Sequence, residues 1–152
     1  MDTLDIILEL MSLDGEYDFL MHNGELIPNY YVDKKGNIFS TKWGKLKKLI
    51  PKVSGQSPYP TVTIRHNGKT KTVRVHRLVC ESIYKLPKKY PGISDTVWKN
   101  TPEIVKKELI KHMQVNHKDG NPKNFHPNNL EWTTPQQNRK HYHTELRVKR
   151  KA

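Results

Sequence analysis

The stretch from Asn116 to Asn138 constrains the fold of this chain more than any other feature. It contains the sequences NHKDGN, from Asn116, and NLEWTT, from Asn129, separated by seven residues. Each lies beside a short apolar piece, over residues 113–117 and 130–133, of the length of a strand. The residues between the two pieces are rich in Asp, Gly, Asn and Pro, which are typical of turns. We therefore expect two short strands joined by a loop.

A helix is predicted directly after the second strand. Thr134 is a suitable cap, Pro135 suits the first helical position, and Gln137 completes a capping box. Asn138 then lies on the first turn of this helix. The order of strand, loop, strand and helix places His117 on the first strand and Asn138 on the helix that faces it.

The charge of the chain is distributed unevenly. Its 152 residues include 27 Lys and Arg and 15 Asp and Glu, a formal net charge of +12. Residues 1–33 contain eight acidic residues and no Lys or Arg, so residues 34–152 carry all 27 basic residues against seven acidic ones, a net charge of +20. A body this basic favours a polyanionic partner, because neutralising phosphates releases counterions.

Cysteine content and hydropathy exclude several other classes of protein. Cys80 is the single cysteine, which excludes an internal disulfide and a cysteine-rich zinc site. Because Cys80 follows an apolar run, we expect a buried thiol in the core. No apolar run is long enough to span a bilayer, and the start of the chain lacks the pattern of a secretory signal. We therefore expect an intracellular protein with no membrane partner.

The middle of the chain has the pattern of a small sheet. Residues 61–65 and 70–75 predict a hairpin around the tight turn Asn67-Gly68. Alternation predicts a core face with Val62, Ile64, Val73 and Val75 and an outer face with Thr61, Thr63, Arg65, Thr72 and Arg74. Such an outer face suits contacts to DNA phosphates and base edges, although an ordinary solvated sheet has the same pattern.

Helical patterns flank the sheet. Residues 2–13 have apolar side chains at helical spacing, typical either of an acidic docking arm or of a helix that covers the next module. Residues 76–84 predict a second helix and residues 87–100 a loop. A third helix is expected from Thr101 and Pro102 onwards. Its expected buried side consists of Ile104, Val105, Leu109 and Ile110.

The two sequences NHKDGN and NLEWTT, with Asn138, resemble the HNH nuclease family. The most similar subgroup ends in Asn rather than His and includes phage homing endonucleases. The resemblance covers residues 113–143, and residues 30–79 are similar to the sheet module that precedes such motifs. It implies an α+β fold with a small antiparallel β-sheet module, linking helices and a ββα-metal (HNH) catalytic motif. The expected segments are an acidic N-terminal helical arm (1–28), a β-sheet DNA-binding module (29–75), a helical linker (76–112) and the HNH motif with a basic C-terminal tail (113–152).

The resemblance implies a role for each polar residue of the motif. His117 would be the general base, which a neutral imidazole suits near pH 7. Asn129 would hold the loop by hydrogen bonds beside His117. Asn116 and Asn138 would bind one divalent ion per active site, Mg²⁺ or Mn²⁺, because amide oxygens and water suit hard cations. Many members carry Asp at the position of Asn116, so both protein ligands are neutral here, and we expect the DNA phosphate to supply most of the negative charge.

Basic residues around the motif and the sheet are expected to contact DNA. The candidates are Arg65, Arg74, Lys45, Lys47, Lys48, Lys118, Arg139, Lys140 and His141. His141 lies on the same helical face as Asn138, so it suits either phosphate binding or support of the metal, and a solvated histidine explains it equally well.

The implied activity is hydrolysis of phosphodiester bonds in double-stranded DNA by a homing-type, metal-dependent endonuclease. One active site per chain cuts one strand, so a monomer would nick and a homodimer would be needed for a paired cut. The expected setting is the cytoplasm of a host cell, such as a bacterium infected by a phage. Two alternatives stay open: a DNA-binding module with an inactive nuclease site, favoured by Asn116, and an RNA-binding protein in which Tyr30, Tyr31, Phe39, Trp43 and Tyr59 stack on bases.

Overall fold

The structure, a computed structural model, describes residues 16–147. Helices and small antiparallel sheets alternate along these residues, so the predicted α+β class is confirmed. The helix expected over residues 2–13 lies outside the described residues. The helical character expected for residues 1–28 is wrong from Tyr17 onwards, where two strands form a hairpin. The turn residues Asn23 and Gly24 have φ of 52° and 79°, and this pair of positive values is the turn chemistry of a tight hairpin.

The first sheet has four antiparallel strands in the order β1-β2-β3-β4. Their bounds are β1 Tyr17–His22, β2 Glu25–Asp33, β3 Ile38–Ser40 and β4 Lys47–Lys48. One side of this sheet faces the core, with fully or nearly fully buried Leu20, Ile27, Tyr30, Val32 and Ile38. Hydrophobic burial therefore fixes which face of the sheet is turned inwards.

A second, two-stranded sheet confirms the predicted hairpin. β5 (Thr61–His66) pairs with β6 (Lys69–Arg74), and Asn67 and Gly68 have φ of 52° and 72° at the turn. Val62 and Ile64 are buried as expected, whereas Val73 is only half-buried. Val75 is buried too, but it is the first residue of the following helix. On the outer side Thr63, Arg65, Thr72 and Arg74 are exposed, and Thr61 is half-buried.

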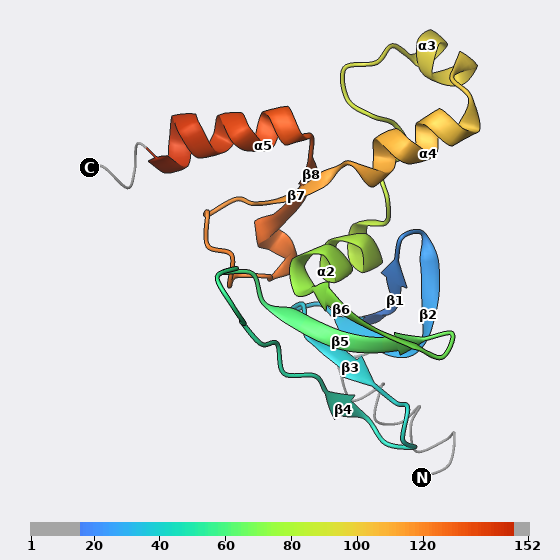
Figure 1. Ribbon diagram of the computed structural model, residues 1–152, viewed down its shortest axis with the longest axis vertical. Helices are drawn as coiled ribbons and strands as arrows, with labels where there is room; N and C mark the ends of the chain where they lie inside the picture. Colours follow the sequence, from blue (N-terminus) through green and yellow to red (C-terminus); the bar gives the residue numbers. More distant parts are fainter. Residues whose placement is uncertain (1–15, 148–152) are drawn as a thin grey trace.

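Helix α2 (Val75–Tyr84) lies at the centre of the molecule and contacts strands of all three sheets (Figure 1). Val75, Leu78, Val79 and Cys80 are completely buried, so the expected core thiol is confirmed. These side chains belong to one apolar cluster that includes both hairpins and the last two strands of the chain. Since burial of each such side chain contributes about 1.5 to 3 kcal/mol, this cluster is the main stabilising element of the fold.

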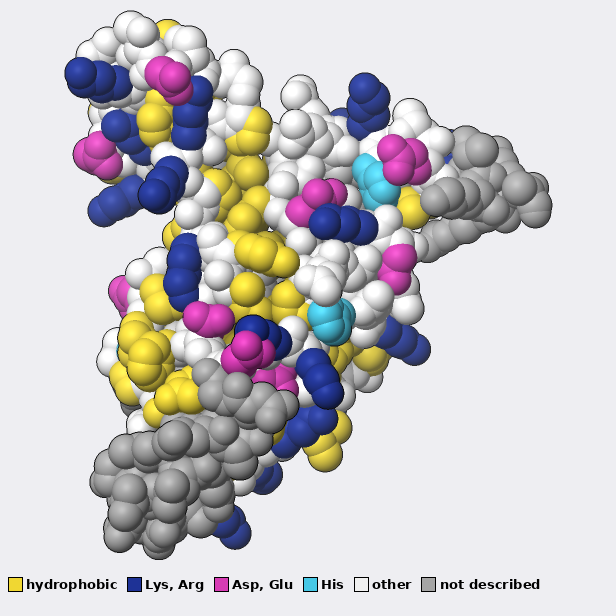
Figure 2. All heavy atoms as spheres, turned by 180° about the vertical axis from the view of Figure 1, so that it is seen from behind, with side chains coloured by type: hydrophobic (Ala, Val, Ile, Leu, Met, Phe, Trp, Pro, Cys, Tyr) yellow, Lys and Arg dark blue, Asp and Glu magenta, His cyan; other side chains and the backbone are white. Residues whose placement is uncertain are grey.

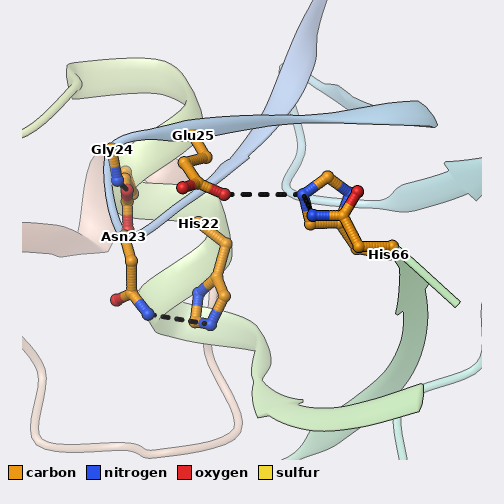
Figure 3. A network of polar contacts seen from close by, with 7 residues as sticks. His22, Asn23, Gly24, Glu25 and His66 are labelled. Carbon is orange, nitrogen blue, oxygen red and sulfur yellow. Dashed lines mark hydrogen bonds and ion pairs between the residues drawn. The ribbon is translucent and has the colours of Figure 1, made fainter. Parts of the chain in front are cut away.

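Polar contacts join the β1–β2 hairpin to the β5–β6 hairpin. The His66 Nε2 atom lies 3.5 Å from the Glu25 Oε2 atom, and the side chains of His22 and Asn23 are 3.3 Å apart in the β1–β2 turn (Figure 3). The Gly24 amide donates a hydrogen bond of 2.5 Å to Oε1 of Glu81 on α2. The turn between β1 and β2 is therefore attached both to β5 and to the central helix.

The segment between α2 and Gln114 differs from the expectation. The expected loop over residues 87–100 contains α3 (Asp95–Asn100), capped by Ser94. Helix α4 (Glu103–Lys111) begins after Pro102, and Thr101 ends α3 instead of capping α4. The expected buried side of α4 is wrong, because no residue of α4 is buried and Ile104 is 79% exposed. The helical periodicity was correct, but α3 and α4 extend away from the central body (Figure 1).

The last described segment has the predicted order of strand, loop, strand and helix. Its elements are β7 (Gln114–His117), a 3₁₀ turn η1 (Pro127–Asn129), β8 (Leu130–Thr133), α5 (Pro135–His141) and the π-helical turn η2 (Tyr142–Leu146). The capping box is confirmed: Thr134 Oγ1 accepts from the Gln137 amide and Gln137 Oε1 accepts from the Thr134 amide, both at 3.1 Å.

Basic side chains are spread over the surface of the described residues. Figure 2 shows Lys and Arg on every described part of one face, with Asp and Glu between them. None of the helices in residues 16–147 has both the length and the apolar character needed to cross a bilayer.

Candidate active site

Helix α2 anchors β7 and β8 to the rest of the molecule. The Arg77 guanidinium lies 4.7 Å from the centre of the Trp132 ring and donates to the Met113 carbonyl. The Trp132 Nε1 atom donates to the Lys85 carbonyl at 2.7 Å, and the Tyr84 hydroxyl donates to the Pro127 carbonyl at 2.8 Å. Both ends of β7 and β8 are therefore held against a buried helix, which fixes the position of the residues on these strands.

His117 is the last residue of β7 and is only 7% exposed. It lines a cavity of about 460 Å³ together with Asn116, Asn138 and Arg139. Its Nε2 atom is buried and has no hydrogen-bond partner among the described residues. Burial lowers the pKa of His117 below its usual value of 6.5, and the nearby Asp119 carboxylate partly opposes this effect. The ring is therefore neutral at pH 7.

Two more aromatic rings surround His117, and the sequence did not single them out for this position. The ring of His76, on α2, packs edge-on against His117 with 4.8 Å between centroids, and the ring of Tyr59 lies 5.8 Å from His117. The Arg74 guanidinium lies 4.9 Å from the centre of the Tyr59 ring. Burial, reinforced by the neighbouring positive groups, lowers the pKa of His76 to about 3. His76 therefore adds no positive charge beside His117 at neutral pH.

Asn129 holds the loop that follows His117. Its Oδ1 atom accepts from the Asp119 amide at 3.0 Å, and its Nδ2 atom donates to Asp119 Oδ1 and to the Asn124 carbonyl, both at 2.9 Å. The Asn129 carbonyl accepts from the Lys118 amide at 2.8 Å. One side chain thus bridges both ends of the loop and fixes the backbone next to His117.

Asn138 lies on the first turn of α5 and lines the cavity. Its Nδ2 atom contacts Oε1 of Gln114 at 3.0 Å, and Gln114 lines the same cavity. Asn116 is 6% exposed, and its Nδ2 atom donates to Oε1 of Glu131 at 2.8 Å. Sequence reasoning missed both partners, Gln114 and Glu131. Only the pairing of β7 with β8, which puts Glu131 directly opposite Asn116, identifies the second one.

The donor atoms of this cavity fit a hard divalent cation. Within residues 16–147 no three His, Cys, Asp or Glu side chains come together as a metal site. The side chains that line the cavity include the amides of Asn116, Asn138 and Gln114, each of which has an oxygen atom. Amide oxygens with water are a donor set for Mg²⁺ or Mn²⁺ rather than for Zn²⁺, which favours Cys and His.

A second cavity, of about 700 Å³, adjoins the first and is more basic. The two share Tyr59, Gln114, Val115 and Asn138, and Lys71, Arg74 and Arg77 line the second. Of the nine predicted DNA-binding residues, Arg139 lines the first cavity and Arg74 the second. The other seven line neither: Arg65, Lys45, Lys47, Lys48, Lys118, Lys140 and His141. His141 instead lies 3.2 Å from the Glu145 carboxylate.

Comparison with known proteins agrees with this geometry. Residues 73–140 match the family described as HNH endonuclease. An uncharacterised HNH endonuclease of Acanthamoeba polyphaga mimivirus is 32% identical over 123 residues, which are 80% of this chain and 29% of that protein. A solved structure of the HNH homing endonuclease I-HmuI, described for DNA binding and cleavage, superposes with a TM-score of 0.56 and 25% identity, covering 86% of this chain and 59% of that one.

The chain spans less than a third of the length of the curated relative and three fifths of the I-HmuI chain. The matched residues nevertheless include β7, β8 and the start of α5, together with the central helix that supports them. The resemblance inferred from NHKDGN and NLEWTT is confirmed, and this chain carries the motif of the HNH endonuclease family.

Proposed function

We propose that this chain is a divalent-metal-dependent DNA endonuclease that cuts one strand per active site. The observation that carries the proposal is the cavity in which a buried, neutral His117 lies with Asn116, Asn138 and Arg139. The family match and the likeness to a DNA-cleaving homing endonuclease support the same activity. The net charge of +20 on residues 34–152 favours DNA as the partner.

His117 is the general base in this proposal. The Nε2 atom of His117 is enclosed and has no hydrogen-bond partner among the described residues. In this proposal the neutral ring carries its hydrogen on Nε2, and Nδ1 takes the proton from the attacking water. Burial keeps the imidazole unprotonated at neutral pH, and its contacts with His76 and Tyr59 hold the ring plane. Asn129 positions His117 through the backbone of the loop that it closes.

Asn116 and Asn138 would hold one Mg²⁺ or Mn²⁺ ion through their amide oxygens. When bound, such an ion polarises the scissile phosphate and stabilises the leaving 3′ oxygen. Arg139, on the same cavity wall, binds a phosphate oxygen as a bidentate donor. Lys71, Arg74 and Arg77 extend positive charge into the adjoining cavity. In this proposal, the neighbouring phosphates of the strand bind along this basic path.

A plasmid-nicking assay tests this function. Supercoiled DNA with the protein and Mg²⁺ or Mn²⁺ is expected to give open circles, and EDTA or His117→Ala is expected to abolish them. The loss of a general base costs 10² to 10⁴-fold in rate. The matched control is His112→Ala, at an exposed histidine that follows the last residue of α4 and lines neither cavity. Salt-sensitive DNA binding without cleavage by either metal would favour the alternative, a DNA-binding module whose nuclease site is inactive because Asn116 is neutral.

A further inference from the structure

The contact between Asn116 and Glu131 determines which way the Asn116 amide is turned. The two residues are directly opposite in the pairing of β7 with β8, and Asn116 Nδ2 donates to Glu131 Oε1 at 2.8 Å. A carboxylate only accepts hydrogen bonds, so the amide nitrogen must face Glu131. Glu131 does not line the cavity, whereas Asn116 does. The Asn116 oxygen is therefore the atom left for the cavity.

The other amide of the site has no such constraint. Asn138 contacts Gln114, and both side chains are amides with a donor and an acceptor. Reversing both of them preserves the hydrogen bond, so this pair does not decide which atom faces a ligand. Of these two amides, only that of Asn116 therefore has its orientation fixed by a carboxylate partner.

Glu131 also places a negative charge next to Asn116, to which it is hydrogen-bonded. The Asp119 carboxylate, which is nearer to His117 in the sequence, is engaged by the loop: Oδ1 accepts from the Asn121 amide at 2.8 Å and Oδ2 from Asn124 at 2.8 Å. An amide that donates to a carboxylate is polarised, which increases the negative charge on its oxygen. In this pair, Asn116 therefore supplies the oxygen that would bind the ion, and Glu131 supplies the negative charge. An Asp at the position of Asn116 would supply both.

We propose that Glu131 is a positioning residue of the metal site, and that its carboxylate orients Asn116 and supplies the charge that this neutral ligand lacks. The inference rests on the proposed function, because it assigns a role toward the ion held by Asn116 and Asn138. When a residue that is hydrogen-bonded to a metal ligand is replaced, the affinity for the metal typically falls about 10- to 100-fold. Glu131→Gln keeps the length and an acceptor oxygen but removes the charge.

Binding of Mn²⁺ tests the inference without relying on turnover. The electron paramagnetic resonance signal of free Mn²⁺ is titrated with the full chain bound to duplex DNA, in a His117→Ala background that leaves the DNA uncut. We expect Glu131→Gln to raise the dissociation constant for Mn²⁺ by 10- to 100-fold. Glu108→Gln, the same change at an exposed position on α4, is expected to leave it unchanged.

A double variant separates the charge from a merely structural role. Asn116→Asp combined with Glu131→Gln moves the carboxylate to the ligand itself and keeps the hydrogen bond across β7 and β8, so we expect it to restore Mn²⁺ binding. Two results would overturn the inference: a Mn²⁺ dissociation constant for Glu131→Gln equal to that of the His117→Ala chain, or Mn²⁺ binding by the double variant as weak as that by Glu131→Gln. Cleavage by the unaltered chain would still uphold the proposed function in either case. Absence of both cleavage and Mn²⁺ binding in the unaltered chain would overturn the function as well.

Discussion

Replacing His76 by phenylalanine should remove a large part of the sensitivity of this fold to mild acid. His76 is 8% exposed on α2 and packs against Tyr59 and His117. Burial lowers its pKa from 6.5 to about 3, and positive charge on His117 when it is protonated, and on Arg74 and Arg77, acts in the same direction. The folded protein therefore keeps this ring neutral at pH values where the unfolded chain protonates it.

The size of the effect follows from proton linkage. Between pH 6.5 and 3 the unfolded chain binds one more proton at His76 than the folded chain does, so the free energy of unfolding falls as the pH falls. At about 1.36 kcal/mol per pH unit, the loss at pH 5 is roughly 2 kcal/mol relative to pH 8. The loss at pH 5 is the same for any folded-state pKa well below 5, and it is a large fraction of the stability of a small domain.

Urea unfolding at pH 8 and pH 5 measures this loss directly. His76→Phe keeps an aromatic ring against Tyr59 and His117 and removes a buried nitrogen, Nδ1, that has no hydrogen-bond partner among the described residues. We expect the unaltered chain to lose about 2 kcal/mol more than His76→Phe between the two pH values. His143→Gln, at an exposed position after α5, should behave like the unaltered chain. Equal losses in the unaltered chain and in His76→Phe would refute the reasoning.

Two further predictions concern the loop packing and the basic path. Gly36→Ala should lower the free energy of unfolding by roughly 2 to 3 kcal/mol, because Gly36 has φ of 86° and a Cβ atom there would lie 2.5 Å from the Phe125 carbonyl oxygen. Gly68→Ala, with φ of 72° but open space around it, should cost only about 1 kcal/mol, and equal losses in urea unfolding would contradict the clash. Arg74→Ala should reduce the slope of log binding constant against log salt by about 0.9, measured by fluorescence anisotropy with a DNA duplex. An unchanged slope would exclude Arg74 from phosphate contact.

The sequence by itself determined the elements whose causes are local. The Asn67-Gly68 turn and the alternation around it define a hairpin, and the Thr134 to Gln137 capping box defines the start of α5. The spacing of NHKDGN, NLEWTT and Asn138 was sufficient to place His117 and Asn138 on facing elements of one cavity. Turn chemistry, capping and strand alternation act over a few residues, so they can be recognised without knowing the rest of the fold.

Local patterns were misleading where the outcome depended on what an element packs against. The apolar side of α4 has a helical period, but the helix extends away from the body and Ile104 stays exposed. Trp43 is 81% exposed, whereas Tyr30 and Phe39 on the preceding strands are buried, and the local sequence does not distinguish these outcomes. The β1–β2 hairpin was missed because its acidic residues suggested a separate arm, although an Asn-Gly turn lies at its centre.

Only the tertiary structure decided the surroundings of His117 and of Asn116. His76 and Tyr59 lie 41 and 58 residues before His117 in the sequence. The packing of α2 against β7 brings His76 to the His117 ring, and Tyr59, which precedes β5, packs against both histidine rings. Glu131 meets Asn116 because β7 and β8 pair in one register, and a shift by one residue would turn its side chain to the other face. Residues distant in sequence meet only where the buried core fixes the register and the position of each element, and a reading of local sequence does not contain that information.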